Sequence, residues 1–259
     1  MTMVLLPPSE GKTSAVGKAK LNLAALSFPE LNQQREKTLN ALLALSNGSA
    51  TKARKVLAIS AKQDWEIERN QQLLTASVAP AWQIYTGVLF DAIGFDQLTA
   101  AQMKKISSLT FVQSALFGLI SIEDRIPAYR LSGDCTLPKL GTMTSVWAKR
   151  CTDILSQRDD LIIDMRSGTY VKLGPIPVGT NSVVPKILQR MPSGPPKIVS
   201  HHNKATKGRI LRAMVESKSS IKTIDQLGQV IASLGADVVV KNPSKVGLPI
   251  TMEVVVDVL

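Results

Sequence analysis

The chain has 259 residues, of which 44% are hydrophobic and 20% are charged, and this composition is typical of a globular protein with a substantial core. It excludes a disordered protein, and no apolar stretch approaches the roughly 20 residues that a membrane-spanning helix needs. The first residues lack the early cation and the unbroken apolar run of a secretory signal. We therefore expect a cytoplasmic protein without a membrane partner, whose two cysteines, Cys135 and Cys151, are reduced thiols.

Positive charge is unevenly distributed along the chain. The formal net charge is +11, and residues 186–222 hold nine lysines and arginines against one acid, Glu216. Such a surplus favours an anionic partner and says nothing about the fold. Most of the excess charge therefore belongs to one segment near the C-terminus.

The first half of the chain reads as mostly helical. Residues 3–6 form a short apolar run that stops at two prolines, which predicts a buried strand followed by a loop. Apolar spacing and favourable first residues then predict helices over 29–46, 49–57, 64–74 and 99–107.

The second half alternates strands with helices. Short apolar runs rich in β-branched residues predict strands over residues 161–165, 197–200, 237–241 and 252–258. Helices are predicted over residues 144–156, 204–216 and 224–234. Helices between successive strands favour crossover connections. We predict a mixed α/β fold with a largely parallel central sheet and a helix-rich N-terminal half. Residues 1–259 are expected to form one domain, the alternative being a helical subdomain at about 27–107.

Two familiar motifs are incomplete. Gly11-Lys12-Thr13 resembles the end of a phosphate-binding P-loop, but Leu6 stands where the first glycine of that motif belongs. His201 and His202 are adjacent, so at a strand end they point to opposite faces and do not share one metal ion. We expect neither a dedicated metal site nor a cofactor.

Three loops follow predicted strands and are crowded with polar residues: 7–13, 166–170 and 201–209. If the strands are parallel, the loops meet at one edge of the sheet, where open α/β sheets bind their ligands. The candidate catalytic residues in or next to these loops and around Tyr85 are Ser9, Glu10, Tyr85, Asp164, Tyr170, His201 and His202. Of these, Glu10 or His201 is expected to serve as an acid or base.

The third loop also predicts an anion site. Asn203 is a good N-cap for the helix expected to follow, and free backbone N–H groups at that end favour an anion. Lys204 and Lys207 fall on the apolar side of this helix, which implies an anionic ligand or, alternatively, a salt bridge to Glu10 or Asp164. The side chains expected to contact an anion or nucleic acid are Lys12, Arg125, Arg130, Arg166, Asn203, Lys204, Lys207 and Arg209.

Five segments, in this order, resemble the YaaA family of bacterial peroxide-stress proteins. They are residues 5–13, 85–90, 125–131, 164–170 and 200–209. The resemblance implies a DNA-binding protein that limits iron-dependent oxidative damage, with an α/β fold of its own, a basic cleft and a helix-hairpin-helix-like element. That element maps near residues 52–66, where Ala58-Ile59-Ser60-Ala61 lacks the hairpin glycine that such elements use.

Two functions remain open from the sequence. The first is binding of duplex DNA, with weak sequence preference, through a basic cleft. The second is an enzyme that acts on a nucleotide or another small anionic substrate at the strand-end loops, because these loops carry more polar groups than phosphate binding requires. A pocket of small-molecule size favours the enzyme, whereas an open groove favours DNA. Direct iron binding has little support from the residue types.

Overall fold

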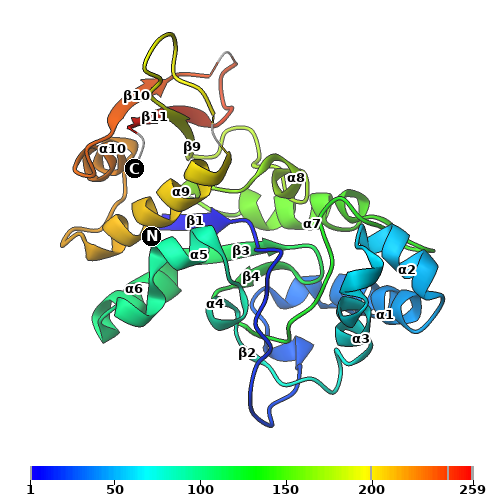
Figure 1. Cartoon of the computed structure of the whole chain (residues 1–259). Helices are drawn as coiled ribbons and strands as arrows, with labels where there is room; N and C mark the ends of the chain where they lie inside the picture. Colours follow the sequence, from blue (N-terminus) through cyan, green and yellow to red (C-terminus); the bar gives the residue numbers. More distant parts are fainter. Residues whose placement is uncertain (1, 199, 244, 258–259) are drawn as a thin grey trace.

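A seven-stranded sheet runs through the protein in the order β10-β11-β9-β8-β1-β3-β4 (Figure 1). The computed structural model describes residues 2–198, 200–243 and 245–257, without the side chains of residues 200–202. Five neighbouring strands are parallel: β11 (Ile250–Val256), β9 (Ser182–Gln189), β8 (Leu161–Asp164), β1 (Thr2–Leu6) and β3 (Thr110–Ser114). The edge strands β10 (Asp237–Lys241) and β4 (Gly118–Ser121) are antiparallel to their neighbours. The predicted mixed, largely parallel α/β sheet is confirmed.

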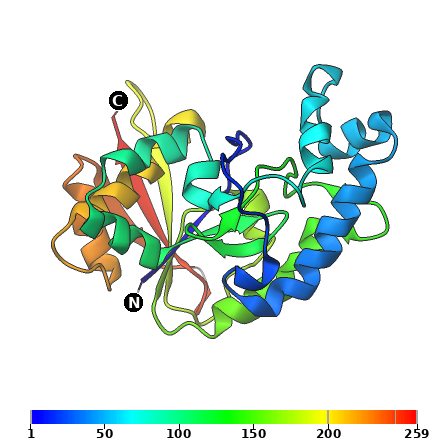
Figure 2. The same cartoon turned by 90° about the horizontal axis from the view of Figure 1, so that it is seen from below.

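The longer predicted helices form close to their expected bounds. They are α1 (Asn32–Ser46), α2 (Ala50–Leu57), α3 (Trp65–Gln71), α6 (Ala100–Leu109), α7 (Met143–Ser156), α9 (Ser200–Glu216) and α10 (Ile224–Ala232). Short elements complete the described fold: α4 (Ala81–Ile84), α5 (Val88–Ile93), α8 (Gly168–Val171), the small strands β2 (Ala79–Pro80), β5 (Arg125–Ile126), β6 (Thr136–Leu137) and β7 (Gly141–Thr142), and the 3-10 turns η1 (Leu23–Ala25), η2 (Pro29–Leu31), η3 (Ala61–Gln63) and η4 (Phe95–Gln97). Helices α1–α3 gather at one end of the molecule, and β9–β11 with α10 at the other (Figures 1 and 2).

β1 sits in the middle of the sheet because both of its faces are apolar. All five of its residues are buried, as expected for a parallel strand covered on both sides. The chain leaves β1 toward β3 on one side and later leaves β8 toward β9 on the other. The carboxyl ends of β1 and β8 therefore lie where the connections diverge, the usual ligand crevice of an open α/β sheet.

The predicted strand at residues 197–200 is wrong. Lys197 makes an isolated antiparallel bridge with Gln189, and Ser200 already begins α9. Asn203 consequently lies inside the first turn of this helix and is not its N-cap. The apolar face predicted for the helix is confirmed by the complete burial of Ile210 and Leu211.

The third parallel strand beside β1 and β8 is β9, which the sequence analysis missed. Pro185 interrupts its apolar run, and proline is disfavoured in strands that have a neighbour on both sides. β8 pairs only with the first two residues of β9, Ser182 and Val183, so Pro185 faces β11 alone. β9 thus projects beyond β8, and its free side borders the crevice. No helix in the described part of the chain is long and apolar enough to cross a membrane.

Candidate functional site

A cavity of about 810 Å³ opens at the carboxyl ends of β1 and β8. Its walls come from the loop after β1, the start of α5, the loop after β8, the projecting part of β9, and the first turns of α9. Ser132 and Asp134 add a further side. The structure thus brings together residues of the three polar segments 7–13, 166–170 and 201–209. The third segment is part of helix α9 and not of a loop.

The loop after β1 is fixed against residues 84–86. The Ser9 hydroxyl donates to the Gly11 carbonyl at 2.5 Å and accepts from the Thr86 N–H at 3.0 Å. The Thr13 N–H donates to the Ile84 carbonyl at 2.9 Å. A Cβ on Gly11 would lie 2.9 Å from the Thr86 hydroxyl, so this close approach favours glycine. Ser9 therefore shapes the cavity wall.

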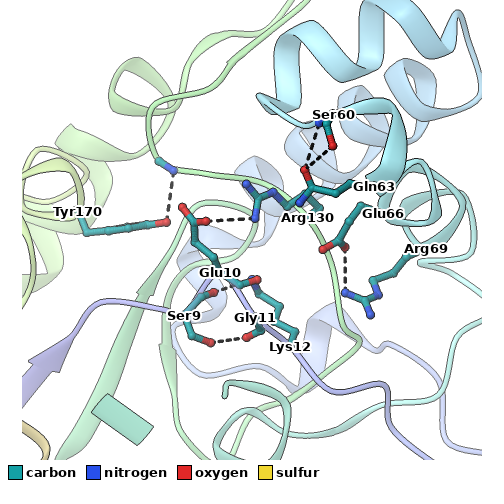
Figure 3. A network of polar contacts seen from close by, with 11 residues as sticks. Ser9, Glu10, Gly11, Lys12, Ser60, Gln63, Glu66, Arg69, Arg130 and Tyr170 are labelled. Atoms are coloured by element: carbon teal, nitrogen blue, oxygen red, sulfur yellow. Dashed lines mark hydrogen bonds and ion pairs between the residues drawn. The ribbon is translucent and has the colours of Figure 1, made fainter. Parts of the chain in front are cut away.

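The buried side chain of Lys12 stabilises the same loop from the interior of the protein. Its ammonium donates to the carbonyls of Ser9 at 2.7 Å and Glu10 at 3.2 Å (Figure 3). It also lies 4.4 Å from the centre of the Tyr129 ring, within cation–π range. Burial, followed by repulsion from Arg130, lowers the pKa of Lys12 to about 7.

The pKa of Lys12 predicts a pH-dependent stability. A lysine with an ordinary pKa of 10.5 in the unfolded chain and about 7 in the fold binds fewer protons when folded between these values. The free energy of unfolding should therefore rise with pH across this window and be lowest below it. Urea denaturation between about pH 6 and pH 9.5 measures the slope. Lys12→Met should flatten it, whereas the exposed Lys204→Met should not. A slope unchanged in Lys12→Met would contradict the assignment.

Tyr85 lies beneath this loop, in a chain of buried hydroxyl groups. Its hydroxyl is 3.0 Å from that of Tyr129, which is 2.7 Å from the Ser114 hydroxyl. Burial raises the pKa of both tyrosines. Tyr85 is therefore a neutral phenol whose hydroxyl is engaged within the fold.

Glu10 and Tyr170 stand together at the rim of the cavity. The Glu10 side chain is 74% exposed, and its carboxylate accepts from an Arg130 Nη1 at 3.3 Å. Figure 3 shows this carboxylate between Arg130 and the Tyr170 ring. The Tyr170 hydroxyl accepts from the Gly133 N–H at 3.4 Å, and burial raises its pKa. A reachable carboxylate beside a neutral phenol provides a base and an acid at one edge of the site.

Arg130 joins this rim to helix α3. The Asn70 side chain donates to the Arg130 carbonyl and accepts from the Arg130 N–H, both at 2.8 Å. Only 12% of the Arg130 side chain is exposed. Arg130 is thus a connecting residue between the helical end of the molecule and Glu10.

Asp164 and Arg166 pair with each other in the interior. The Arg166 guanidinium donates to both Asp164 oxygens at 2.8 Å and to Gln113 Oε1 at 3.1 Å. Both side chains are buried, and the Arg166 N–H also donates to Asp164. This bidentate pair satisfies the two charges internally and fixes the course of the loop after β8.

Helix α9 supplies cations to the opposite wall. Lys204 is exposed and Lys207 half-buried, and both line the cavity together with Asn203. The Lys207 ammonium donates to the Met165 carbonyl at 3.0 Å, so its contact with the loop after β8 is to a carbonyl. Burial lowers the pKa of Lys207, against an opposing attraction to Asp164.

Two of the remaining sequence candidates do not line the cavity, and two fall on side chains outside the described structure. Arg125, on β5, donates to the Val78 carbonyl at 3.0 Å, and Arg209 is exposed on α9. Neither residue is part of the cavity lining. His201 and His202 belong to the first turn of α9, and their side chains fall outside the described structure.

Sequence reasoning missed Lys186, Ser132 and Asp134 as lining residues. Lys186 belonged to the basic segment, but only the assignment of β9 places it at the cavity. Asp134 accepts from the Thr169 hydroxyl at 3.1 Å. This contact joins segments that are distant in the sequence, so no local sequence pattern predicts it.

Helices α2 and α3 form a helical hairpin, which Asn70 on α3 joins to Arg130. Ala58 ends α2 with φ 50° and ψ 50°, the left-handed conformation that glycine adopts without strain. An alanine therefore takes the backbone conformation that usually calls for a hairpin glycine. Lys52 and Lys55 are exposed on α2, whereas Arg54 pairs with Asp64 at 2.7 Å.

Comparison with known proteins gives a consistent family. The family model described as "Peroxide stress protein YaaA" matches residues 1–235. A UPF0246 protein of Streptomyces coelicolor is 37% identical over 256 residues, covering 98% of this chain and 98% of the relative. A UPF0246 protein of Corynebacterium efficiens is 38% identical over 247 residues, covering 94% and 97%. The chain belongs to the YaaA family of peroxide stress proteins, whose relatives named here are the UPF0246 proteins.

Proposed function

We propose that the protein binds duplex DNA in the cytoplasm during peroxide stress and limits iron-dependent oxidative damage. The observation that carries this proposal is the net charge of +11, part of which is exposed on two elements, Lys52 and Lys55 on α2 and Lys204 and Arg209 on α9. Membership in a family described by peroxide stress supports the physiological setting. Lys12, Arg130 and Arg166 contribute little to DNA contact, because they already hold carbonyls or carboxylates of the chain.

Binding of this kind is electrostatic and shows weak sequence preference. Each phosphate that a lysine or arginine neutralises releases condensed counterions, so the affinity falls steeply with salt. Four such contacts predict an affinity loss of about two orders of magnitude between 50 and 200 mM salt.

Fluorescence anisotropy of a labelled duplex over a salt series tests the DNA proposal. The pairs Lys52→Gln/Lys55→Gln and Lys204→Gln/Arg209→Gln should each weaken binding and reduce the salt slope by about two. The matched control is Lys37→Gln/Lys104→Gln, two exposed lysines on α1 and α6. An affinity that is flat with salt, or equal in both test variants and the control, would overturn the proposal.

A second candidate function is supported by the cavity itself. The cavity of about 810 Å³ at the carboxyl ends of two parallel strands has the size of a small-molecule site. A duplex would instead need an open groove. In this function Lys204 and Lys207 hold an anionic group, Glu10 acts as a base and Tyr170 as an acid. The site would then belong to an enzyme acting on a small anionic substrate.

Ligand-induced stabilisation tests this second function. A panel of phosphorylated and carboxylated metabolites should contain compounds that raise Tm, because a ligand that binds only the folded state stabilises it. Lys207→Met should reduce the rise for the same compounds, whereas Lys218→Met, an exposed lysine that does not line the cavity, should not. A panel without any Tm shift would argue against the enzyme.

A further inference from the structure

The cavity has two electrically different sides. Lys186, Lys204 and Lys207 line it from β9 and α9, on one flank of β8. Glu10 and Asp134 line it from the loop after β1 and the 132–134 segment, together with the hydroxyl groups of Ser132 and Tyr170. A ligand that matches both sides carries negative charge at one end and hydrogen-bond donors at the other.

Apolar side chains make up a further part of the cavity wall. They are Pro7, Pro8, Val88, Leu89, Phe90 and Met165. A sugar phosphate or a small carboxylate presents little apolar surface to such a wall, whereas a nucleobase presents two flat faces. Bases in protein pockets are held in this way, by apolar contact on their faces and hydrogen bonds at their edges.

The rim of the cavity is also attached to the helical hairpin. Asn70 on α3 holds the backbone of Arg130, and Arg130 holds Glu10. The hairpin on which DNA binding is proposed is thus joined through two residues to Glu10, which lines the cavity.

We propose that the cavity binds one nucleotide, with its phosphate against Lys204 and Lys207 and its base among the apolar wall, Glu10 and Tyr170. This inference rests on the second candidate function, for which it names the ligand class. The nucleotide has two sources, a free nucleoside monophosphate or a nucleotide extruded from DNA. The chemistry of recognition is the same for both.

Calorimetric titration with free ligands is the first arm of the test. The probes are the common nucleoside monophosphates, their nucleosides, ribose 5-phosphate and inorganic phosphate. At least one monophosphate should bind ten or more times tighter than its nucleoside and than ribose 5-phosphate, since each part adds charge-assisted or apolar contacts worth about a factor of ten. Lys204→Gln/Lys207→Gln should weaken it by at least about tenfold, and Lys218→Gln/Lys222→Gln should not.

Substitutions at Gly168 test the placement of the ligand in variants that are expected to remain folded. Gly168 lines the cavity, and an added Cβ meets no atom within 4 Å. Gly168→Ala, Gly168→Leu and Gly168→Phe should weaken the monophosphate progressively with side-chain volume while Tm changes little. Equal affinity across this set would overturn the placement of the ligand.

A duplex carrying one 2-aminopurine is the second arm. Extrusion should raise its fluorescence on binding, and Gly168→Phe should remove that rise while the salt-dependent affinity for the duplex persists. Binding of either source supports the proposal. Ribose 5-phosphate binding as tightly as every monophosphate, without a fluorescence rise, overturns it and leaves the enzyme function standing. If the unmodified protein fails to bind the duplex at every salt concentration, only the DNA proposal is overturned.

Discussion

Gly208→Ala is expected to lower the free energy of unfolding by about 3 kcal/mol, the upper part of the range for overpacked positions. Gly208 lies in the middle of α9 where this helix crosses α5. A Cβ built there would lie 2.3 Å from the Leu89 carbonyl oxygen and 2.8 Å from the Ala92 Cβ. Because the first obstacle is backbone, the two helices must separate to make room. Residues of both helices line the cavity, so ligand binding should weaken together with stability.

Gly228→Ala provides a matched control in α10. There a Cβ would meet only side-chain carbons, of Val238 at 3.7 Å and Met252 at 3.8 Å. Helix propensity alone should then stabilise this variant by about 0.5–1 kcal/mol. Urea denaturation of both variants gives the comparison. Two changes of the same sign would show that the contact between α5 and α9 does not determine the effect.

Asp164→Ala is expected to cost about 3–5 kcal/mol, because it leaves the Arg166 guanidinium buried without its carboxylate. Both side chains are almost fully excluded from solvent, with 0% of the Arg166 and 3% of the Asp164 side chain exposed. The loop after β8 also loses the acceptor for the Arg166 N–H, so its course should change.

The double variant Asp164→Ala/Arg166→Met separates the charge from the packing. It removes both members of the pair and should lose less stability than Asp164→Ala, since no unpaired charge remains. The single variant Arg166→Met completes the comparison. Gln113 loses its hydrogen bond from Arg166 in this variant and in the double variant but keeps it in Asp164→Ala, so the loss cancels in the coupling energy. A double variant as unstable as the sum of the two singles would contradict coupling between the two charges.

Elements with a strong local pattern could be predicted from the sequence. β1 ends before two prolines after an apolar run, and α6 begins directly after Thr99, whose side chain accepts from the Gln102 N–H as a cap. The loops after β1 and β8 were identified because polar residues follow directly after buried strands. These patterns involve residues that are close together in the sequence, so they can be recognised without knowledge of the tertiary structure.

Features that depend on tertiary contacts could not be predicted. β9 tolerates Pro185 only because β8 ends early, and the run at 197–200 resembles a strand although α9 begins at Ser200. Lys12 looks like a phosphate ligand until its ammonium is seen to hold two carbonyls of its own loop. Charge type is visible in a sequence, but the partner that neutralises it is not.

The hydrogen bonds from Asn70 to the backbone of Arg130, and from Arg130 to Glu10, connect the hairpin to the rim of the cavity. A ligand that displaces Glu10 changes the restraint on Arg130 and hence on α3. Linkage then requires that DNA on the hairpin alter the affinity of the cavity by the same factor by which the cavity ligand alters the affinity for DNA. Such reciprocity would make occupancy of the cavity a signal that sets how firmly the protein holds DNA.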